Sequence, residues 1–473
     1  MRPQKNFNLI VVPIIASISG IRGTIGGKPG ESLSPIDIVK YSAAFGTWLV
    51  RTYPQNRRMV LGRDARISGE MVRRLVVGTL QSIGIDVIDI GLATTPTVEI
   101  AVTAEQAAGG IILSASHNPK QWNALKLLNH LGEFISEADG QAILHIAGYE
   151  DYDFADINNL GQYYTNDTYL QKHIDRILAL PPVNVEAIKK RQFKILIDGV
   201  NSVGGWAVPR LLKALGVEQI VELYCTPDGQ FPHNPEPLPE NLGAVAIEVK
   251  RNNCDLAFVV DPDVDRLAII CEDGSMFGEE YTLVAVADYI LQRQKGPTVS
   301  NLSSSRALRD VAEKAGVAYH ASAVGEVNVV AKMKEVGAVI GGEGNGGIIY
   351  PALHYGRDAL VGIALFLSYM AEFGRSCTHL RSRYPNYHLI KNKAELTPDI
   401  DMAKVFEKLK QKYKTQNIDT RDGLRIEFDR DWIHLRMSNT EPIMRIYAES
   451  LSSVTAWAMI KQIQNDIKHI TMQ

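Results

Sequence analysis

A segment of the form helix, glycine, strand and polar loop occurs three times in this chain. The three copies are Ser82–Pro96, Ala214–Pro227 and Lys314–Gly325, and neighbouring copies are about one domain length apart. Around them, short apolar runs alternate with helical patterns, which is typical of α/β domains. We therefore expect three related α/β units.

Length and composition limit the class of protein. A chain of 473 residues is too long for one hydrophobic core. Its net charge of −3 predicts no strong attraction to nucleic acid or to an anionic membrane surface. No apolar run approaches the roughly 18 residues that a membrane helix needs, and the apolar patch Leu9–Ile15 is broken by Pro13. We interpret that patch as a first strand and not as a signal peptide.

The cysteines point to the compartment. Cys225, Cys254, Cys271 and Cys377 lie far apart, without a C-x-x-C pair. Scattered thiols of this kind are typical of a reducing compartment, so we expect a cytoplasmic protein.

The first loop with a chemical signature follows the apolar run Gly109–Leu113 and reads Ser-Ala-Ser-His-Asn-Pro. Proline disfavours the helical region for the residue before it, so Asn118-Pro119 predicts a turn. Ser116 is therefore expected on a loop at the end of a strand, where α/β sheets bind ligands. Taken alone, the motif is more typical of an ordinary loop.

The second loop carries three carboxylates at alternate positions, Asp261, Asp263 and Asp265, between two apolar strands. Carboxylates packed this closely repel one another unless a cation is present, and oxygen ligands suit Mg²⁺. An EF-hand calcium loop is disfavoured because Arg266 occupies the place of its glycine. A purely structural acidic turn is the other alternative.

Two further polar loops follow. Gly341–Gly347 displays Glu343 and Asn345 on glycine-rich backbone, an arrangement that suits sugar hydroxyls as well as a simple flexible turn. His354, Arg357 and Asp358 follow closely and are candidates for the same cleft. The last loop combines hydroxyl, amide and guanidinium groups that suit phosphate, and its candidate residues are Arg436, Ser438, Asn439, Thr440 and Arg445. A surface hairpin is the alternative for this loop.

Together these loops resemble those of the α-D-phosphohexomutases, over nearly the whole chain and in the family's order. Ser19–Gly23 and Gly62–Ser68 resemble two early signatures, and the four loops resemble the phosphoserine, magnesium, sugar and phosphate loops. The resemblance implies four domains around a central cleft, three related α/β units and a smaller C-terminal α+β domain. We place them at residues 1–165, 166–266, 267–380 and 381–473.

The resemblance also implies a mechanism. A phosphorylated Ser116, its charge neutralised by Mg²⁺ on the three aspartates, exchanges its phosphoryl group with a sugar monophosphate through a hexose bisphosphate, which also serves as activator. Lys126 matches the family's acid–base lysine. Arg22, His117 and Arg266 are implied to steady the phosphoserine. Glu343, Asn345 and His354 are implied to contact the sugar, while Arg436, Ser438, Asn439, Thr440 and Arg445 hold the other phosphate.

The choice of sugar is inferred from positions at which this chain departs from the family's usual residues. Asn345 and Gly347 stand where many relatives have serine and histidine, Asn439 and Ala124 replace commoner glycines, and Val324–Asn328 lacks a lysine found in several phosphomannomutases. The family's proposed histidine base is thereby absent, although His354 is a substitute. The combination of Val324–Asn328 with Gly342–Gly347 resembles the phosphoglucosamine mutase branch, with glucose or mannose phosphate as the alternative substrate.

Two other classes are disfavoured. A serine hydrolase using Ser116 and His117 would have no need of the aspartate triplet, and the chain has no G-x-S-x-G elbow. A non-catalytic sugar-phosphate-binding protein would be expected to lose the nucleophile or the metal ligands, which are all present. We expect a monomer or homodimer that binds a phosphosugar and neither nucleic acid nor membrane.

Overall fold

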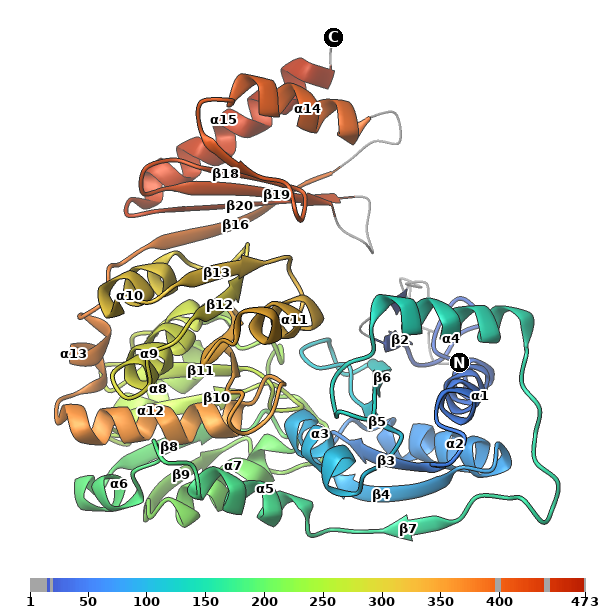
Figure 1. Cartoon of the computed structure of the whole chain (residues 1–473). Helices are drawn as coiled ribbons and strands as arrows, with labels where there is room; N and C mark the ends of the chain where they lie inside the picture. Colours follow the sequence, from blue (N-terminus) through green and yellow to red (C-terminus); the bar gives the residue numbers. More distant parts are fainter. Residues whose placement is uncertain (1–14, 18–19, 396–400, 438–442, 472–473) are drawn as a thin grey trace, which may run out of the picture.

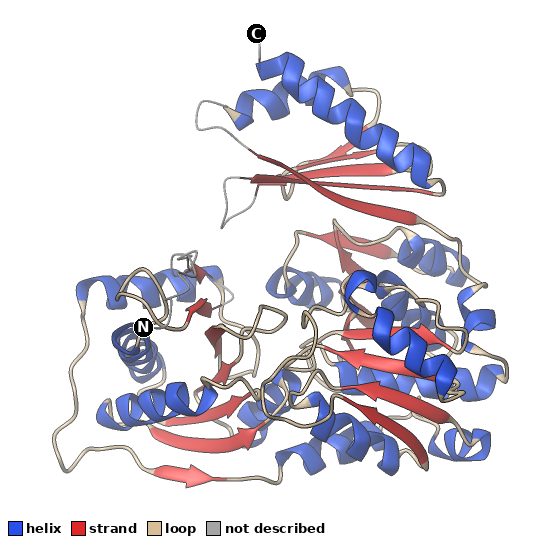
Figure 2. Ribbon diagram, turned by 180° about the vertical axis from the view of Figure 1, so that it is seen from behind, coloured by secondary structure: helices blue, strands red, loops and turns tan. Residues whose placement is uncertain are grey.

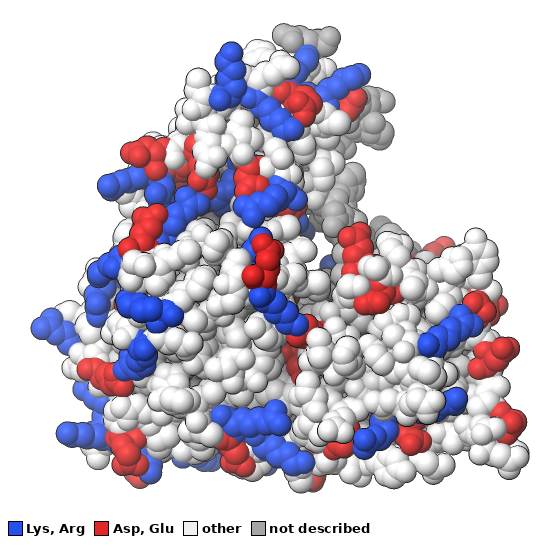
Figure 3. Space-filling model, viewed as in Figure 1, with Lys and Arg blue, Asp and Glu red and all other residues white. Residues whose placement is uncertain are grey.

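The computed structural model describes residues 15–17, 20–395, 401–437 and 443–471, arranged around four sheets that define domains I to IV. The chain passes through them in order, and domain IV stands above domain III with domain I to its side (Figure 1). The surface is hollowed between domains I and IV (Figure 3), as expected for domains around a central cleft. Most of the expected first strand, Leu9–Ile15, lies outside the described residues.

Domain I is a seven-stranded sheet with helices on both faces, visible from behind in Figure 2. Its strand order is β1-β2-β6-β5-β3-β4-β7. Its elements are β1 (Ile15–Ser17), β2 (Gly20–Thr24), α1 (Pro35–Thr52), β3 (Arg58–Arg63), α2 (Gly69–Ser82), β4 (Asp86–Leu92), α3 (Thr95–Ala104), β5 (Gly109–Leu113), β6 (Trp122–Leu128), α4 (Glu137–Tyr149) and β7 (Tyr163–Thr165).

Domains II and III each contain a four-stranded sheet. Domain II comprises α5 (Tyr169–Leu178), α6 (Val185–Arg191), β8 (Lys194–Asp198), α7 (Gly204–Ala214), β9 (Gln219–Leu223), the short 3₁₀ helix η1 (Pro239–Asn241), α8 (Gly243–Arg251), β10 (Leu256–Val260) and β11 (Leu267–Cys271). Domain III comprises α9 (Glu279–Leu291), β12 (Thr298–Asn301), α10 (Ala307–Ala315), β13 (Tyr319–Ser322), α11 (Glu326–Val336), β14 (Ile340–Glu343), β15 (Gly347–Ile349), α12 (Ala359–Phe373) and α13 (Cys377–Arg381).

The three α/β units share one topology, which confirms the repeat predicted from the sequence. In each unit, three neighbouring strands are parallel and a fourth strand pairs antiparallel at one edge of them. The strand orders, with the antiparallel strand first, are β6-β5-β3-β4, β11-β10-β8-β9 and β15-β14-β12-β13. The three helix–glycine–strand segments fall at the same place, as α2–β4, α7–β9 and α10–β13.

One expected domain boundary cuts through a sheet. β11 pairs antiparallel with β10, so the sheet of domain II continues past residue 266, where the sequence placed the boundary. An apolar strand directly after a polar loop looks the same in sequence whether it starts a new sheet or returns to the old one. The boundary expected at 380 falls inside α13.

Domain IV is a five-stranded antiparallel sheet with two helices on the face away from domain III (Figure 1). Its elements are β16 (His388–Glu395), α14 (Met402–Lys412), β17 (Asn417–Asp419), β18 (Leu424–Glu427), β19 (Trp432–Met437), β20 (Ile443–Ser450) and α15 (Ser453–Thr471). Its apolar core is separate from those of the other domains. This arrangement agrees with the expected C-terminal α+β domain.

Domains II and III share one continuous apolar core. Within it Phe366 on α12 lies edge-on to Phe258 on β10, at 6.2 Å between ring centroids, and to Phe277, at 5.2 Å. All three side chains are fully buried. These two domains therefore form one cooperative unit through α12. Among the described helices, none is both long and apolar enough to cross a membrane.

Replacing Phe366 with alanine removes the aromatic ring at the centre of this shared core. We expect Phe366→Ala to lower the free energy of unfolding by about 3–5 kcal/mol, the usual cost of a large-to-small change in a core. Urea denaturation, followed by intrinsic fluorescence, measures it. Tyr149→Ala, at a side chain that is 76% exposed, is the matched control and should change stability little. Loss of less than about 1 kcal/mol in Phe366→Ala would contradict a shared core at this position.

Candidate active site

Three of the polar loops occupy the same position in the three repeats. Each connects a buried parallel strand to the antiparallel strand beside it: β5 to β6 for Ser116, β10 to β11 for the aspartates, and β14 to β15 for Asn345. The same loop position in the three repeats therefore carries a serine, a group of aspartates and a glycine-rich segment.

Ser116 touches the aspartate loop directly. Its Oγ donates a hydrogen bond of 2.6 Å to Asp261 Oδ2, across the boundary of domains I and II, and lies 3.5 Å from His117 Nδ1. The residue is buried and has a φ of +48°, in the left-handed region that non-glycine residues rarely adopt. Such a conformation persists only where the surroundings hold it.

Arg66 stabilises the left-handed backbone conformation of Ser116. Its fully buried guanidinium donates to the carbonyl oxygens of Ser116 (2.5 Å), Asn118 (2.6 Å), Pro119 (2.7 Å) and Trp122 (3.0 Å). Asp64 balances its charge at 3.0 Å and also accepts from Ser114 Oγ, which in turn accepts from the Ser116 N–H. A rigid five-donor fork suits this task, because one side chain fixes the whole loop.

The three aspartates are fully buried, and their oxygens lie within 4.8 Å of one another. Burial and the neighbouring Asp265 and Asp263 raise the pKa of Asp261 well above its usual range. Cations from two other domains partly offset this repulsion. Lys126 of domain I lies 2.5 Å from Asp263 Oδ2, and Arg357 of domain III lies 2.7 Å from Asp265 Oδ2.

The pKa values reflect this balance. Burial alone would lower the pKa of Lys126, but Asp263 and Asp265 outweigh it and raise the value. Burial alone would raise the pKa of Asp263, but Lys126 outweighs it and lowers the value. Lys126 is therefore held in the charged form beside the serine loop.

The aspartate cluster fits a divalent cation. Oδ1 of Asp263 and Oδ1 of Asp265 are buried and have no hydrogen-bond partner among the described residues, which leaves two ligand atoms unused. Carboxylate oxygens are ligands of the kind that Mg²⁺ takes. An EF-hand is excluded because the loop is flanked by strands β10 and β11.

Arg357 connects the aspartates to the glycine-rich loop. Besides Asp265 it donates to Glu343 Oε2 at 3.0 Å and to Glu326 Oε2 at 2.9 Å. Glu343 also accepts from Asn301 Nδ2 at 2.8 Å, while Asn345 Oδ1 accepts from the N–H of Gly347 at 3.1 Å. Glu343 is thus part of an ion network that continues to the aspartates.

His354 lies between two carboxylates. Its Nδ1 is 3.1 Å from Glu99 Oε2, and its Nε2 is 3.3 Å from Asp358 Oδ2, which also binds His173 at 2.9 Å. Burial lowers the pKa of His354, but the carboxylates of Asp358 and Glu99 outweigh it and raise the value to about 10. The pKa of its partner Glu99 is raised to about 8, mainly by burial. The imidazolium of His354 joins domains I, II and III here, and it has no hydrogen bond to Glu343 or Asn345 among the described residues.

Among the remaining candidates, Arg22, Arg266 and Arg445 form a cationic group near His117. Burial, with Arg445 and Arg266 nearby, lowers the pKa of Arg22. Burial, with Arg266 and Arg22 nearby, lowers the pKa of His117 well below its usual range. Arg445 of domain IV is thus close enough to Arg22 of domain I for electrostatic interaction. Arg436 pairs with Asp422 at 2.9 Å, while Ser438, Asn439 and Thr440 lie outside the described residues.

These loops match a known family. Models of the phosphoglucomutase/phosphomannomutase α/β/α domains I, II and III match residues 15–153, 171–274 and 278–387. A phosphoglucomutase/phosphomannomutase of Thermococcus kodakarensis is 36% identical over 92% of this chain and 95% of its own. This chain is an α-D-phosphohexomutase.

Other similarities agree with that membership and with its enzyme class, the isomerases. A probable phosphoglucosamine mutase of Methanopyrus kandleri is 32% identical over 93% of this chain and 94% of its own. The crystal structure of a phosphoglucomutase/phosphomannomutase family protein from Burkholderia thailandensis superposes with a TM-score of 0.83, at 27% identity over 96% of both chains. The phosphohexomutase fold and family expected from the sequence are thereby confirmed.

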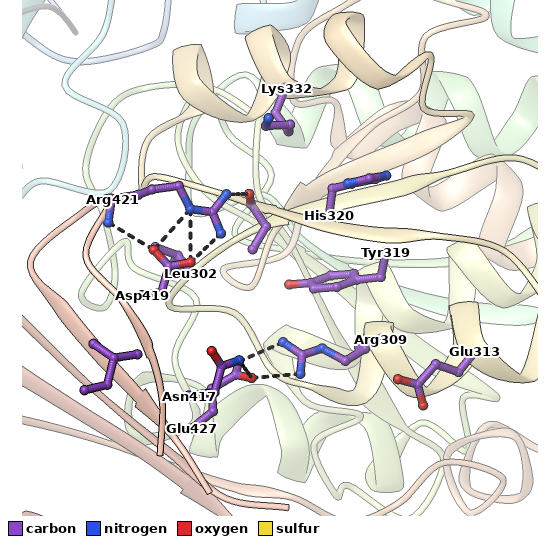
Figure 4. Close-up of a pocket in the computed structure, with 12 residues that line it drawn as sticks. Leu302, Arg309, Glu313, Tyr319, His320, Lys332, Asn417, Asp419, Arg421 and Glu427 are labelled. Carbon is purple, nitrogen blue, oxygen red and sulfur yellow. Dashed lines mark hydrogen bonds and ion pairs between the residues drawn. The ribbon is translucent and has the colours of Figure 1, made fainter. Parts of the chain in front are cut away.

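A separate cavity lies at the junction of domains III and IV (Figure 4). It has a volume of about 470 Å³, and none of its lining residues belongs to the loops described above. Arg309 forms a bidentate pair with Glu427 across it, at 2.7 and 3.1 Å. The cavity therefore lies between the two domains, outside the loop that carries Ser116.

Several residues of the site were not assigned a role from the sequence. Arg66, Asp64 and Ser114 lie inside the motifs that carried the resemblance, so their place at the strand ends was a usable signal. Thr95, which donates to Asp263 Oδ2 at 2.6 Å, is the first residue of α3 in the first repeat. Glu326 lies in Val324–Asn328, which was compared with the family only for the choice of sugar, and Asn301 carried no signal. Only tertiary structure brings these two residues to Arg357 and Glu343.

The charged state of His354 predicts a pH dependence of stability. A histidine whose pKa is raised on folding stabilises the protein fully below its unfolded pKa of about 6.5, and this contribution disappears as the pH rises through the folded value. We expect the wild type to lose roughly 2 kcal/mol or more between pH 6.5 and about 10 relative to His354→Gln. Thermal unfolding across this range measures it, and the exposed His145→Gln is the control. Parallel pH profiles for wild type and His354→Gln would contradict an imidazolium at this position.

Proposed function

We propose that the chain is a phosphoglucosamine mutase, which interconverts glucosamine 6-phosphate and glucosamine 1-phosphate. The proposed route is a phosphoserine at Ser116 and a hexose 1,6-bisphosphate intermediate. The observation that carries the proposal is the 2.6 Å hydrogen bond from Ser116 Oγ to Asp261, within a buried carboxylate cluster with unused ligand atoms.

In the proposed reaction, phosphorylated Ser116 transfers its phosphoryl group to the free hydroxyl of the sugar monophosphate. The Oγ–P bond breaks, the sugar O–P bond forms, and the sugar hydroxyl proton passes to the serine oxygen. The bisphosphate then reorients, and its other phosphoryl group returns to Ser116 by the reverse exchange. Phosphoryl transfer depends mainly on positioning and charge neutralisation.

Lys126 and the arginines supply fixed charge in this scheme. Because its pKa is raised, Lys126 begins as a proton donor in the acid–base role proposed for it. His117, whose pKa is lowered well below its usual range, stays neutral beside Oγ. Arg22 and Arg266 are proposed to steady the phosphoserine.

Asp261, Asp263 and Asp265, with an oxygen on Ser116, are proposed to hold Mg²⁺. When bound, this ion neutralises negative charge on the phosphoryl group.

The sugar and its second phosphate are assigned to the other two loops. Glu343 and Asn345 are proposed to bind hydroxyl groups, with His354 nearby, and the phosphate is proposed to bind Arg436, Ser438, Asn439, Thr440 and Arg445. One phosphate site must serve both orientations of the bisphosphate, which favours a domain IV that moves about its junction with domain III.

The choice of glucosamine is supported by Val324–Asn328 together with Gly342–Gly347, and by relatives named as probable phosphoglucosamine mutases. A phosphoglucomutase or phosphomannomutase is the second candidate, favoured by the name of the relative from Thermococcus kodakarensis. We further propose a cytoplasmic monomer or homodimer, in keeping with four free cysteines among the described residues.

A mutase assay tests the substrate. With Mg²⁺ and the matching hexose 1,6-bisphosphate, we expect kcat/KM for glucosamine 6-phosphate to exceed that for glucose or mannose 6-phosphate, since this ratio defines discrimination. Ser116→Ala should lower turnover by about 10³-fold or more, because it removes the proposed nucleophile. The exposed Ser382→Ala is the control. Better turnover of glucose or mannose phosphate would make the second candidate correct, and no turnover of any sugar would favour a binding protein.

Metal removal tests the aspartate cluster. We expect EDTA to abolish turnover and excess Mg²⁺ to restore it, because three buried carboxylates without a cation repel one another. Asp263→Asn should weaken Mg²⁺ binding, measured by calorimetry. An enzyme that keeps full turnover in EDTA, or an Asp263→Asn variant with unchanged affinity, would exclude this metal assignment.

A further inference from the structure

Glu236 is a carboxylate beside the phosphoserine loop that the mechanism above does not use. It lies in the segment 224–238 between β9 and η1, and its Oε1 accepts from Arg266 Nη1 at 3.0 Å. The same oxygen is 3.7 Å from His117 Nε2. It therefore contacts one proposed phosphoserine-binding group and faces another.

The backbone around Glu236 is fixed. Its N–H donates to Asn234 Oδ1 at 3.1 Å, and its carbonyl accepts from Asn241 Nδ2 at 2.8 Å. Further back, Gly229 (φ +73°) approaches domain I so closely that an added Cβ would lie 2.2 Å from the Ala65 carbonyl oxygen. These backbone contacts position the Glu236 carboxylate next to Arg266.

Segment 224–238 also contacts Arg66, which holds the backbone of Ser116. The Phe231 ring lies 5.1 Å from the guanidinium carbon of Arg66, which binds the Ser116 carbonyl. A cation over an aromatic ring is stabilised by the ring's electrons. Segment 224–238 of domain II therefore approaches domain I at two points, Phe231 at Arg66 and Glu236 near His117.

The surrounding charge explains why a carboxylate is needed there. Arg22, Arg266 and Arg445 are close enough that their repulsion contributes to a lowered pKa at Arg22. When Ser116 is unphosphorylated, Arg266 has Glu236 as its anionic partner. When Ser116 carries a phosphoryl group, a charge of about −1.5 to −2 arrives beside the same cations. The phosphoryl group and Glu236 then compete for Arg266 and repel each other.

We propose that Glu236 is a positioning residue whose charge substitutes for the phosphoryl group on Arg266 while Ser116 is unphosphorylated. This inference rests on the proposed function. Glu236 stabilises the state in which the bisphosphate is bound and Ser116 is free, and it destabilises the phosphoenzyme. It thereby eases the transfer of the phosphoryl group from Ser116 to the sugar.

The test measures phosphorylation of Ser116 by intact-mass spectrometry as glucosamine 1,6-bisphosphate is titrated into dephosphorylated protein with Mg²⁺. In each exchange, Ser116 Oγ gains the phosphoryl group, its proton passes to the sugar oxygen, and the sugar monophosphate leaves. Glu236→Gln removes the charge and nearly keeps the shape. We expect it to reach half phosphorylation at about one tenth of the wild-type concentration, since a charge-assisted contact is worth at least that factor.

A second readout follows the opposite direction. Phosphorylated Glu236→Gln, mixed with glucosamine 6-phosphate in a single turnover, should lose its phosphoryl group more slowly than the wild type. Glu236→Asp keeps the charge and should lie between the two. The exposed Glu240→Gln, four residues further on, is the matched control and should equal the wild type.

The sign of the effect separates this role from a structural one. If Glu236 only supported the loop, its loss would lower phosphorylation of Ser116. Unchanged or lower phosphorylation of Glu236→Gln, with normal phosphorylation of the wild type, would overturn the inference alone. A wild type that no hexose bisphosphate phosphorylates at Ser116 would overturn the proposed function and this inference with it.

Discussion

The burial of three aspartates in one loop is the constraint on which the rest of the structure depends. Asp261, Asp263 and Asp265 have no exposed surface, and isolated carboxylates in such a place are costly. Lys126 from domain I and Arg357 from domain III form ion pairs with these aspartates. Neutralising this charge therefore requires three domains at once, so the same electrostatic demand that suits a cation also fixes the relative positions of these domains.

Much of this arrangement could be predicted from the sequence, because its signals are local. The strand before each polar loop is an apolar run, and the glycine after each helix recurs at the same place in three units. Contacts between domains left no such signal. Glu326, Asn301 and Glu236 are ordinary surface-type residues in the sequence, and only the packing of domains brings them to Arg357, Glu343 and Arg266. The end of domain II was misplaced for the same reason, since strand pairing is not local.

The three repeats place three functional loops at equivalent positions of one shared fold. One hairpin position carries a serine in the first unit, carboxylates in the second and a glycine-rich loop in the third. The backbone framework is shared, while the side chains have diverged into complementary chemical roles. Domain IV, with its own sheet and core, joins through polar contacts such as Arg309 with Glu427. Interfaces of this polar kind are typical of domains that move relative to one another.

The left-handed backbone of Ser116 also bears on which amino acid can occupy that position. Threonine also carries a hydroxyl group on Cβ. Its branched Cβ is disfavoured at positive φ, where serine fits with less strain. Since Arg66 fixes the conformation through four carbonyl groups, the loop has little freedom to adapt to a bulkier residue. The geometry of the main chain thus favours serine over threonine at this position.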